Sequence, residues 1–549
     1  MFKKTVSVII MVTMLAALLA GCRGKGVETG TVEPAVQENE STDTGSDTNT
    51  GSDTNTENNA NTAEKEAFKV ATVRWADWGE AYHEGFVDTA AANAGITISW
   101  DTILNADWGD KKAVMMAGGD LPDAFLGSIC FSAAEIASNQ SAFIALDDYI
   151  DENMPNFKAI LEKDPTMKAL ATSSDGHIYG LPGKKPCRPL VANQMFINQT
   201  WLDNLNLTMP QTYEEFYNVL KAFKEQDANG NGDPDDEIPY GQGYADSTMF
   251  FLLPFGMTIG ADNTYLMSVK DGEPVFLPTL ESYRDGIEWM HKAYAEGLID
   301  PELFTQDTSM RDAKLMNEET PLIGCAPGWT ADATFGPNAG EYAALPALSG
   351  PDGERYVSSD PEHWNYSRNE FMITNTCEDP AALLRFMDQF YTEDASIQTF
   401  YGSFGVGIEK DGDNYSLLPP SDGTSADTFA WVNSLRDFGP KYVEEGFNSR
   451  VKLPTDSGDG LKLELDKELS QYAKPAYPNV SYTNEQLNDL STLYIDINSY
   501  VTTMQAKWVT EGGASEEWNT YLDTLKQMGF DDFMKIQKDA YEVYQASAK

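Results

Sequence analysis

The chain opens with one apolar run, from Val6 to Ala20, and no later run of similar length follows it. Lys3 and Lys4 precede this run, which is too short to cross about 30 Å of hydrocarbon. A positively charged start followed by a short apolar stretch predicts a secretory signal peptide over residues 1–21. The fold must therefore be built from later residues, outside the membrane and without a bilayer-spanning helix.

The apolar run ends in Leu19-Ala20-Gly21-Cys22. This ending resembles the bacterial lipobox, in which the cysteine becomes the lipidated first residue of the mature protein. We therefore expect Cys22 to carry an acyl anchor of the palmitate type and to hold the protein at the outer face of a bacterial cytoplasmic membrane. The alternative is an ordinary secretory signal that happens to end beside a cysteine.

A stretch of biased composition follows the cysteine. Residues 23–64 contain no aromatic side chain, and the sequence GSDTNT at 45–50 is repeated at 51–56. Such a segment buries too little apolar surface to offset its chain entropy, so we expect residues 22–66 to form a disordered, acidic stalk after the lipidated cysteine. About forty flexible residues span on the order of 35 Å, enough to lift a domain off the lipid surface. The alternative is a disordered tail without a spacer role.

The composition changes near Phe68, where aromatic residues become frequent. Roughly 480 residues exceed what one hydrophobic core usually contains, so we expect two lobes. The cysteines that follow Cys22 are too few to form a disulfide scaffold for a domain of this size, so the apolar core must stabilise the fold. They are Cys130, Cys187, Cys325 and Cys377.

The chain is strongly acidic, with a formal net charge of −48. Such a surface repels nucleic acid and anionic lipid headgroups, which excludes both as expected partners and disfavours polyanionic ligands. Cations and neutral polar solutes are compatible with it.

Short β-rich runs alternate with amphipathic helical stretches, which predicts layered α/β structure. Thr212 and Glu215 form a capping-box signature ahead of one apolar helix face over 216–223. Strands are expected at 69–73, 96–100, 123–126, 194–197, 322–324 and 371–373, and further helices at 283–298, 381–391 and, with breaks at Gly512-Gly513 and Gly529, over 485–548.

A series of motifs then points to a known family. The segments are Met116–Asp123, Asp175–Pro182, Phe196–Leu202, Asp227–Pro239, Ala295–Pro301 and Tyr401–Val406. Their order resembles the extracellular solute-binding proteins of bacterial ABC importers (family 1), with a closer likeness to the large lipoprotein sugar-binding branch related to alginate-type oligosaccharide-binding proteins. The likeness covers nearly the whole body.

The resemblance implies an α/β fold of the periplasmic-binding-protein type II class, with two lobes, a hinge and a ligand cleft between the lobes. Carried over roughly, the first lobe is 67–190 plus 345–400 and the second is 191–344 plus 401–549. It further implies a monomer that captures a sugar or oligosaccharide outside the cell and delivers it to the transmembrane subunits of an ABC permease. A peptide or another polar solute is the alternative cargo.

The loop from Asp227 to Glu237 predicts a calcium site. Calcium prefers six to eight oxygen ligands, and Asp227, Asn229 and Asn231 supply oxygens at alternate positions, followed by the backbone carbonyl of Asp233. A full EF-hand loop would end in Glu at its twelfth position, where this chain has Ile238.

Related solute receptors close a similar loop with an Asp-Glu pair. Asp236 and Glu237 match that pair with one inserted residue, and Asp235 with Asp236 matches it without insertion; we favour Asp236 and Glu237. A cage made entirely of oxygen ligands leaves no open position, so the expected role is structural. The alternative is a polar turn that binds no metal.

Aromatic residues beside strand ends predict the solute site. Sugars present flat C–H faces and hydroxyl rims, which suit stacking aromatic rings together with carboxylates and amides. Core packing is the alternative for each tryptophan. The candidates are Trp75, Asp77, Trp78, Trp108, Trp329, Trp364 and Tyr366.

An enzyme is the competing class of protein. With 86 acidic residues a carboxylate pair for glycoside hydrolysis is easily imagined, but no motif isolates one. The sequence has no HExxH, Gly-x-Ser-x-Gly, P-loop or GxGxxG motif. We therefore expect a binding protein without catalytic residues, and a secreted polysaccharide-acting enzyme stays the alternative.

Overall fold

The computed structural model describes residues 67–547 apart from 76–77, 187–188, 192, 234, 261–263, 361–364, 425 and 455–456. The expected signal peptide, Cys22, the stalk, Asp77 and Trp364 lie outside the described residues. None of the described helices combines the length and apolar character that a bilayer-spanning segment needs.

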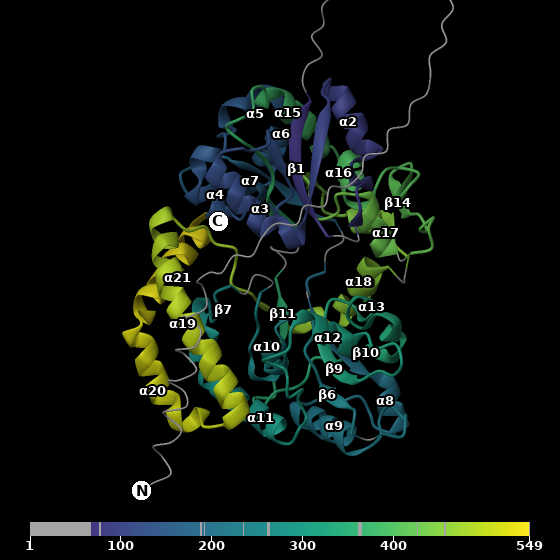
Figure 1. Cartoon of the computed structure of the whole chain (residues 1–549), viewed down its shortest axis with the longest axis vertical. Helices are drawn as coiled ribbons and strands as arrows, with labels where there is room; N and C mark the ends of the chain where they lie inside the picture. Colours follow the sequence, from purple (N-terminus) through teal and green to yellow (C-terminus); the bar gives the residue numbers. More distant parts are fainter. Residues whose placement is uncertain are drawn as a thin grey trace, which may run out of the picture. The chain divides into compact units, whose positions relative to one another are not determined.

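A six-stranded mixed sheet is built around β1, whose sequence FKVATVR is apolar on both faces (Figure 1). Phe68 and Val70 pack into one core cluster, while Ala71 and Val73 pack into another on the opposite face. Both faces of the sheet are therefore covered. The strand order is β15 (Lys441–Tyr442), β4 (Gly180–Lys184), β12 (Tyr366–Ile373), β3 (Ala124–Leu126), β1 (Phe68–Arg74) and β2 (Ile98–Leu104), with β12 antiparallel to both of its neighbours.

Helices cover both faces of this first sheet. Val87, Phe157 and Leu383 belong to the core on one face, and Trp108 and Ile136 to the core on the other. The helices of the first face are α2 (Phe86–Ala94), α5 (Asp147–Asn153), α6 (Pro155–Lys163), α7 (Pro165–Ala171) and α15 (Pro380–Asp388), and those of the second are α3 (Asn105–Gly118) and α4 (Ala133–Ser138).

A second sheet has four strands, in which β5 is antiparallel to both neighbours. Its order is β10 (Tyr342–Ala344), β5 (Gln194–Asn198), β9 (Ile323–Gly328) and β6 (Ile238–Tyr240). The helices that follow its strands in sequence are α8 (Gln199–Asn204), α9 (Tyr213–Glu225), α10 (Ser247–Phe251), α11 (Glu281–Ala295), α12 (Thr308–Leu315) and α13 (Ala331–Phe335).

The C-terminal region is helical, as predicted, and its helices are separated at the expected glycines. Gly512, Gly513 and Gly529 have positive φ angles of 78°, 94° and 90°. Because other residues rarely adopt this conformation, the helices end there. They are α19 (Asn484–Glu511), α20 (Ala514–Gln527) and α21 (Phe530–Ser547), of which α19 and α20 pack on α11 (Figure 1).

Residues 401–475 lie between α15 and the C-terminal helices in the sequence. Strand β15 of this segment pairs with β4 of the first sheet, although residues 441–442 fall within the range expected for the second lobe, 191–344 plus 401–549. The other elements of this segment are α17 (Ala426–Asn433), α18 (Gly458–Leu469), β13 (Ile408–Asp411), β14 (Asn414–Leu417), β16 (Val451–Lys452) and β17 (Ala473–Pro475), and α16 (Glu393–Tyr401) leads into it. Strand β17 pairs with β11 (Val357–Ser359). Elsewhere in the chain, β7 (Met267–Lys270) and β8 (Glu273–Phe276) form a hairpin.

The described cysteines form no disulfide. Cys130, Cys325 and Cys377 are buried free thiols. The fold of the described residues is therefore held by its apolar cores and hydrogen bonds.

The predicted cap at the start of α9 is present. Thr212 Oγ1 accepts a hydrogen bond from the Glu215 amide at 3.1 Å, and the Glu215 carboxylate accepts one from the Gln211 amide at 2.8 Å. The cap therefore forms, with its reciprocal bond shifted by one residue.

Thr212→Ala is expected to lower the free energy of unfolding by about 1 kcal/mol, because an amide of the first helical turn loses its acceptor. Urea denaturation measures this loss. Thr212→Ser keeps the hydroxyl and should retain most of the stability; equal destabilisation by serine and alanine would contradict a capping role.

Candidate functional site

The ends of two strands carry tryptophans at sheet edges. Trp75 follows β1 directly and Trp78 lies three residues further on; Trp329 follows β9. In open α/β sheets the carboxyl ends of parallel strands are where ligands usually bind. These two edges are therefore the natural places to look for a site.

At the end of β1 four aromatic rings gather into what we call the ring cluster: Trp75, Trp78, Trp431 and Phe438. Trp78 is its central member, because its ring centroid lies 4.3 Å from that of Trp75 and 4.2 Å from that of Trp431. The Trp78 and Trp431 rings are stacked, with planes 18° apart, and Phe438 lies 5.9 Å from Trp78. Trp75 is 37% exposed, so the cluster presents an aromatic face to solvent.

A buried arginine connects the two segments that carry these rings. Arg74, the last residue of β1, is 2% exposed. Its Nη1 donates to the Ser434 carbonyl at 3.3 Å, and its Nη2 donates to the Trp431 carbonyl. Its guanidinium carbon also lies 4.5 Å from the Tyr82 ring centroid. Burial lowers the pKa of Arg74 to about 10.

A second buried arginine, Arg436, lies near the Trp431 ring. Arg436 Nη2 donates to the Asp459 carboxylate of α18 at 3.0 Å, and the Arg436 guanidinium carbon lies 6.0 Å from the Trp431 ring centroid. The turn that follows α17 is therefore fixed to α18 by an ion pair whose side chains are both buried.

At the other sheet edge, Trp329 contacts Lys462 of α18. Lys462 Nζ lies 4.5 Å from the Trp329 ring centroid, within the range of a cation–π interaction. Lys462 is 1% exposed, and this burial lowers its pKa to about 7, against the opposing charge of Asp466. The buried Lys462 side chain thus covers one face of the Trp329 ring.

Helix α18 also contacts the chain that runs from the first sheet to the second. Asp466 accepts hydrogen bonds from the amides of Leu190 and Val191, at 3.1 and 2.9 Å. Leu469 packs with Val191 in a small apolar cluster. Asp459, Lys462, Asp466 and Leu469 have the spacing of one helix face.

The edge that carries Trp329 also contains an amide without a partner. Gln194 opens β5 and pairs in register with Gly328 of β9. Its side chain is 4% exposed, and neither its nitrogen nor its oxygen has a hydrogen-bond partner among the described residues. A buried amide of this kind costs free energy unless a polar group completes its hydrogen bonds.

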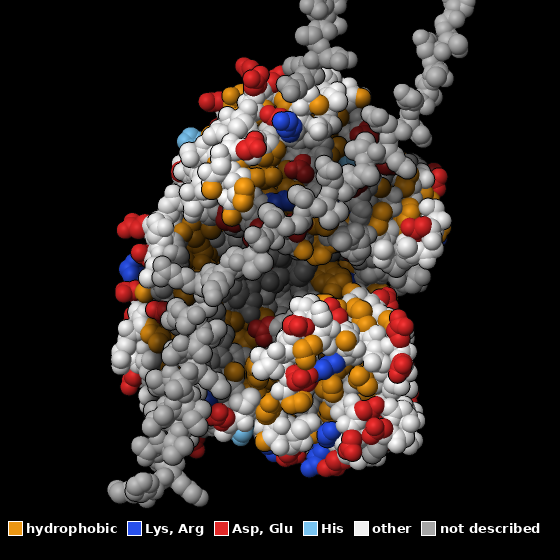
Figure 2. Space-filling view, viewed as in Figure 1, with side chains coloured by type: hydrophobic (Ala, Val, Ile, Leu, Met, Phe, Trp, Pro, Cys, Tyr) orange, Lys and Arg blue, Asp and Glu red, His pale blue; other side chains and the backbone are white. Residues whose placement is uncertain are grey.

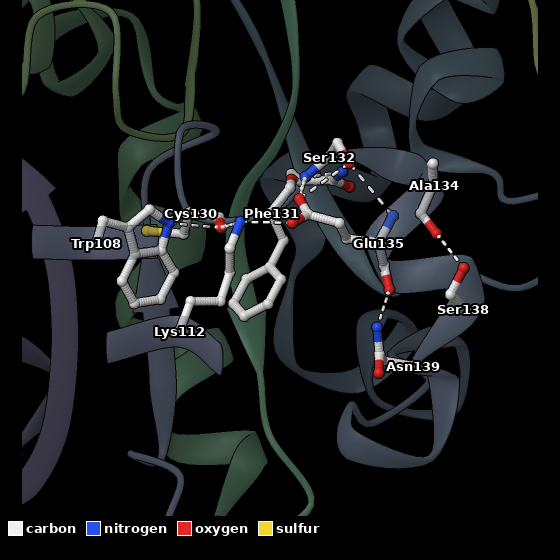
Figure 3. A network of polar contacts seen from close by, with 10 residues as sticks. Trp108, Lys112, Cys130, Phe131, Ser132, Ala134, Glu135, Ser138 and Asn139 are labelled. Atoms are coloured by element: carbon white, nitrogen blue, oxygen red, sulfur yellow. Dashed lines mark hydrogen bonds and ion pairs between the residues drawn. The ribbon is translucent and has the colours of Figure 1, made fainter. Parts of the chain in front are cut away.

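The remaining predicted aromatic residues lie elsewhere. Trp108 is 5% exposed in the core under the first sheet, where its Nε1 donates to the Cys130 carbonyl at 3.1 Å (Figure 3). Lys112 lies beside the same ring and pairs with Glu135. Trp108 therefore has the environment of a core residue. Tyr366 begins strand β12 rather than preceding a strand, and Lys184 Nζ lies 5.3 Å from its ring centroid.

Sequence reasoning missed two members of the ring cluster, Trp431 and Phe438. Trp431 lies on α17 and Phe438 in the turn before β15, so neither follows a strand end. Because neither belongs to a strand-end motif, no local pattern of the kind that marks Trp75 and Trp78 could have found them.

The predicted calcium loop is a series of turns in which side chains accept backbone amides. Asp227 accepts from the Gly232 amide at 3.0 Å, and Asn231 accepts from the Asp233 amide at 2.7 Å. Asp236 accepts from the side-chain amides of Asn229 and Asn231, at 2.9 and 2.7 Å. The side chains of Asn229 and Asn231 therefore converge on Asp236.

The donor set of this loop suits a hard cation in part. Asp227 Oδ1 and Glu237 Oε2 are buried oxygens with no hydrogen-bond partner among the described residues. Glu237 is 2% exposed, and burial raises its pKa. Within the described residues, however, no three Asp, Glu, His or Cys side chains gather as a metal would require. The unpartnered carboxylate oxygens fit calcium, while the loop as it stands is not a closed cage.

Two α/β sheets whose edges carry aromatic rings and a buried amide define a two-lobed solute-binding protein. Residues 72–397 match the family of bacterial extracellular solute-binding proteins, and the chain belongs to that family. The relatives below agree with the fold class and with the resemblance drawn from the sequence.

The chain is 30% identical over 480 residues to the fructooligosaccharide ABC transporter substrate-binding protein FusA of Streptococcus pneumoniae serotype 4 (strain ATCC BAA-334 / TIGR4), covering 82% of this chain and 86% of FusA. A structure of a FusA EF-hand mutant in complex with fructo-nystose has a TM-score of 0.75 at 27% identity, covering 88% of this chain and all of the other.

An HMO-binding, ABC-transporter-associated solute-binding protein from Bifidobacterium longum infantis ATCC 15697 gives a TM-score of 0.76 at 27% identity, with coverage of 88% and 99%. The alginate-binding protein AlgQ2 shares the fold, with a TM-score of 0.65 at 21% identity and coverage of 87% and 99%.

Proposed function

We propose that this solute-binding protein captures a sugar or oligosaccharide outside the cell and delivers it to an ABC permease. The observation that carries the proposal is the ring cluster at the end of β1, with Trp75 exposed at its surface. Stacked indoles offer the flat apolar surface that the C–H face of a sugar ring contacts. FusA and the Bifidobacterium relative, which are described as binding oligosaccharide and HMO, support this cargo.

The residues proposed to contact the solute fall into two groups. The ring cluster and Trp329 supply apolar faces, and Gln194 supplies an amide that can donate to and accept from hydroxyl groups. We also propose solute contacts for three residues chosen for their positions beside strands in the sequence: Asp77, Trp364 and Tyr366. Trp108 is left out of it because it is buried in the core.

The acidic surface supports a neutral solute. Figure 2 shows acidic side chains spread over the face drawn, with fewer basic ones among them, in keeping with 86 acidic and 38 basic residues. A polyanionic glycan would be repelled before it reached the site.

A thermal-shift screen against a glycan panel tests the proposal, followed by titration calorimetry of each hit. We expect at least one neutral oligosaccharide to raise the melting temperature and to be recovered intact after incubation. Shortened products on chromatography would support the alternative of a glycoside hydrolase. A panel without any hit, together with a shift by peptides, would overturn the sugar assignment.

We also propose that calcium binds the loop after α9 and has a structural role. The FusA structure described as an EF-hand mutant supports a calcium loop in that relative. The unpartnered oxygens of Asp227 and Glu237 support calcium binding here. The proposed ligands are Asp227, Asn229, Asn231, the carbonyl of Asp233, Asp236 and Glu237.

Removal of calcium by a chelator is expected to lower the melting temperature. At a free calcium concentration 1,000 times the dissociation constant, binding to the folded state alone stabilises it by about 4 kcal/mol, which is lost with the ion. Differential scanning calorimetry with EDTA, and after calcium is restored, measures this.

Asp227→Asn should reduce the response to the chelator, because the amide can still accept from Gly232 but carries no charge. Asp422→Asn is the matched control, since Asp422 also accepts an amide in a surface turn, from Thr424 at 3.0 Å. A wild-type melting temperature that is insensitive to EDTA would contradict the proposal.

Finally, we propose that Cys22 carries the lipid anchor and that residues 23–66 act as a spacer beside the permease. Tethering near a partner raises the effective concentration of the receptor. The Bacillus subtilis (strain 168) relative named Lipoprotein LipO, 28% identical over 352 residues, supports this part of the proposal.

A further inference from the structure

Arg74 joins two segments that are far apart in the sequence. It donates to the Trp431 carbonyl across 357 residues and to the Ser434 carbonyl across 360. Helix α17 ends at Asn433, so these two carbonyls lie at its carboxyl end. Carbonyls in the last turn of a helix have no intrahelical donor, and a guanidinium can satisfy two of them at once.

Among the described residues, no acid pairs with the buried Arg74. No ion pair between Arg74 and a carboxylate occurs within the described residues, and burial lowers the pKa of Arg74, the only opposing charge effect being that of Tyr82. Buried charges are normally paired, so the partial negative charge at the end of α17 is the counterpart that Arg74 has. The placement of this cation is explained by α17 and by the two rings that it faces.

Those rings connect Arg74 to the ring cluster. Its guanidinium carbon lies 5.3 Å from the Trp78 ring centroid and 4.5 Å from that of Tyr82. Trp75 is the next residue in the chain, and Trp431 is the residue whose carbonyl Arg74 holds. One side chain therefore fixes the end of β1, which carries Trp75 and Trp78, to the helix that carries Trp431.

Trp431 and Phe438 also lie beyond residues 72–397, the part of the chain that matches the family description. Half of the ring cluster is thus supplied by a later segment that packs on the part of the chain matching the family. Within the described residues, the Trp431 ring also stacks on Trp78 of that part.

We propose that Arg74 is a positioning residue for carbohydrate binding: it anchors the end of α17, holds Trp431 against Trp78, and so shapes the surface on which the sugar stacks. This inference rests on the proposed function. Arg74 itself is too buried to contact solute, so its effect on affinity must pass through Trp431.

The test compares Arg74→Lys, Arg74→Met, Trp431→Ala and the double variant Arg74→Lys/Trp431→Ala, using the hit of the glycan screen. Lysine keeps the charge but cannot bond two carbonyls in a fixed fork, so we expect about a tenfold loss of affinity for both Arg74 variants. In the Trp431→Ala background, Arg74→Lys should cost almost nothing more, because the group it positions is gone.

A second readout does not need a ligand. Stacked indoles give an exciton couplet in circular dichroism, and Trp431→Ala identifies the part due to the Trp78–Trp431 pair. Arg74→Lys should lose the same part while the helical signal is retained. Arg385→Lys is the control, since Arg385 is exposed on α15 and donates to Asn153.

The outcomes separate the two proposals. Full affinity and an intact couplet in both Arg74 variants would overturn the positioning role, as would additive losses in the double variant. If the wild-type protein binds no glycan, the proposed function fails. In that case the couplet alone decides whether Arg74 positions Trp431.

Discussion

Trp78→Ala is expected to weaken glycan binding about 100-fold, equivalent to about 2.7 kcal/mol. Trp78 contacts each of the other three rings, so its loss removes a stacking face and also the support of Trp75 and Trp431. Aromatic pairs of this kind contribute about 0.5–1.5 kcal/mol each beyond their buried area. Titration calorimetry with the glycan found in the screen measures the loss.

Two variants control this experiment. Trp78→Phe keeps a ring at the centre of the cluster and should lose less affinity than the alanine variant. Trp518→Ala removes a tryptophan of α20, outside the ring cluster, whose ring stacks on Tyr521 at 5.4 Å, and should leave affinity unchanged. Equal affinities of the wild-type protein and Trp78→Ala would remove the ring cluster from the proposed site.

Cys22→Ala is expected to move the protein from the membrane fraction into the medium. Lipid chains stabilise membrane anchoring by about 0.8 kcal/mol per buried CH₂ group. Without them, the negative charges of the protein and of the anionic lipid surface repel each other. Solute uptake should fall with the loss of the tether, while the affinity of the released protein for its glycan should not change. Fractionation, uptake of labelled glycan and calorimetry measure the three quantities.

Cys377→Ala is the matched control, because it removes a cysteine from the folded body and should leave the protein on the membrane. Retention of the Cys22→Ala variant in the membrane fraction would contradict the lipid anchor. Reduced glycan affinity of the released protein would contradict the separation of tether from binding site.

The sequence predicts the elements of the fold best where burial decides them. Strand β1 and the helices from 484 to 547 occur as expected, because apolar residues on both strand faces and glycines with positive φ leave few alternatives. The strand expected at 96–100 lies instead at Ile98–Leu104. It is a partly exposed edge strand, and its bounds follow its pairing with Phe68–Arg74 rather than its own pattern.

The candidate site was predictable only where it is local in sequence. Trp75 and Trp78 were found because they follow a strand, but the rings that complete their cluster come from residues more than 350 positions later. Trp108 was proposed for its loop-like surroundings, yet it opens the amphipathic helix α3 and packs on Phe125 and Phe131. No local pattern distinguishes a tryptophan that covers a core from one that faces solvent.

Helix α18 contacts both the segment beside the ring cluster and the chain that runs from the first sheet to the second. From Asp459 to Leu469 the helix is about 15 Å long, and its hydrogen-bonded backbone makes it a rigid element. One end is fixed to Arg436 beside the ring cluster, its middle to Trp329, and its far end to the amides of Leu190 and Val191. One face of α18 therefore joins the segment beside the ring cluster to the chain that runs between the two sheets.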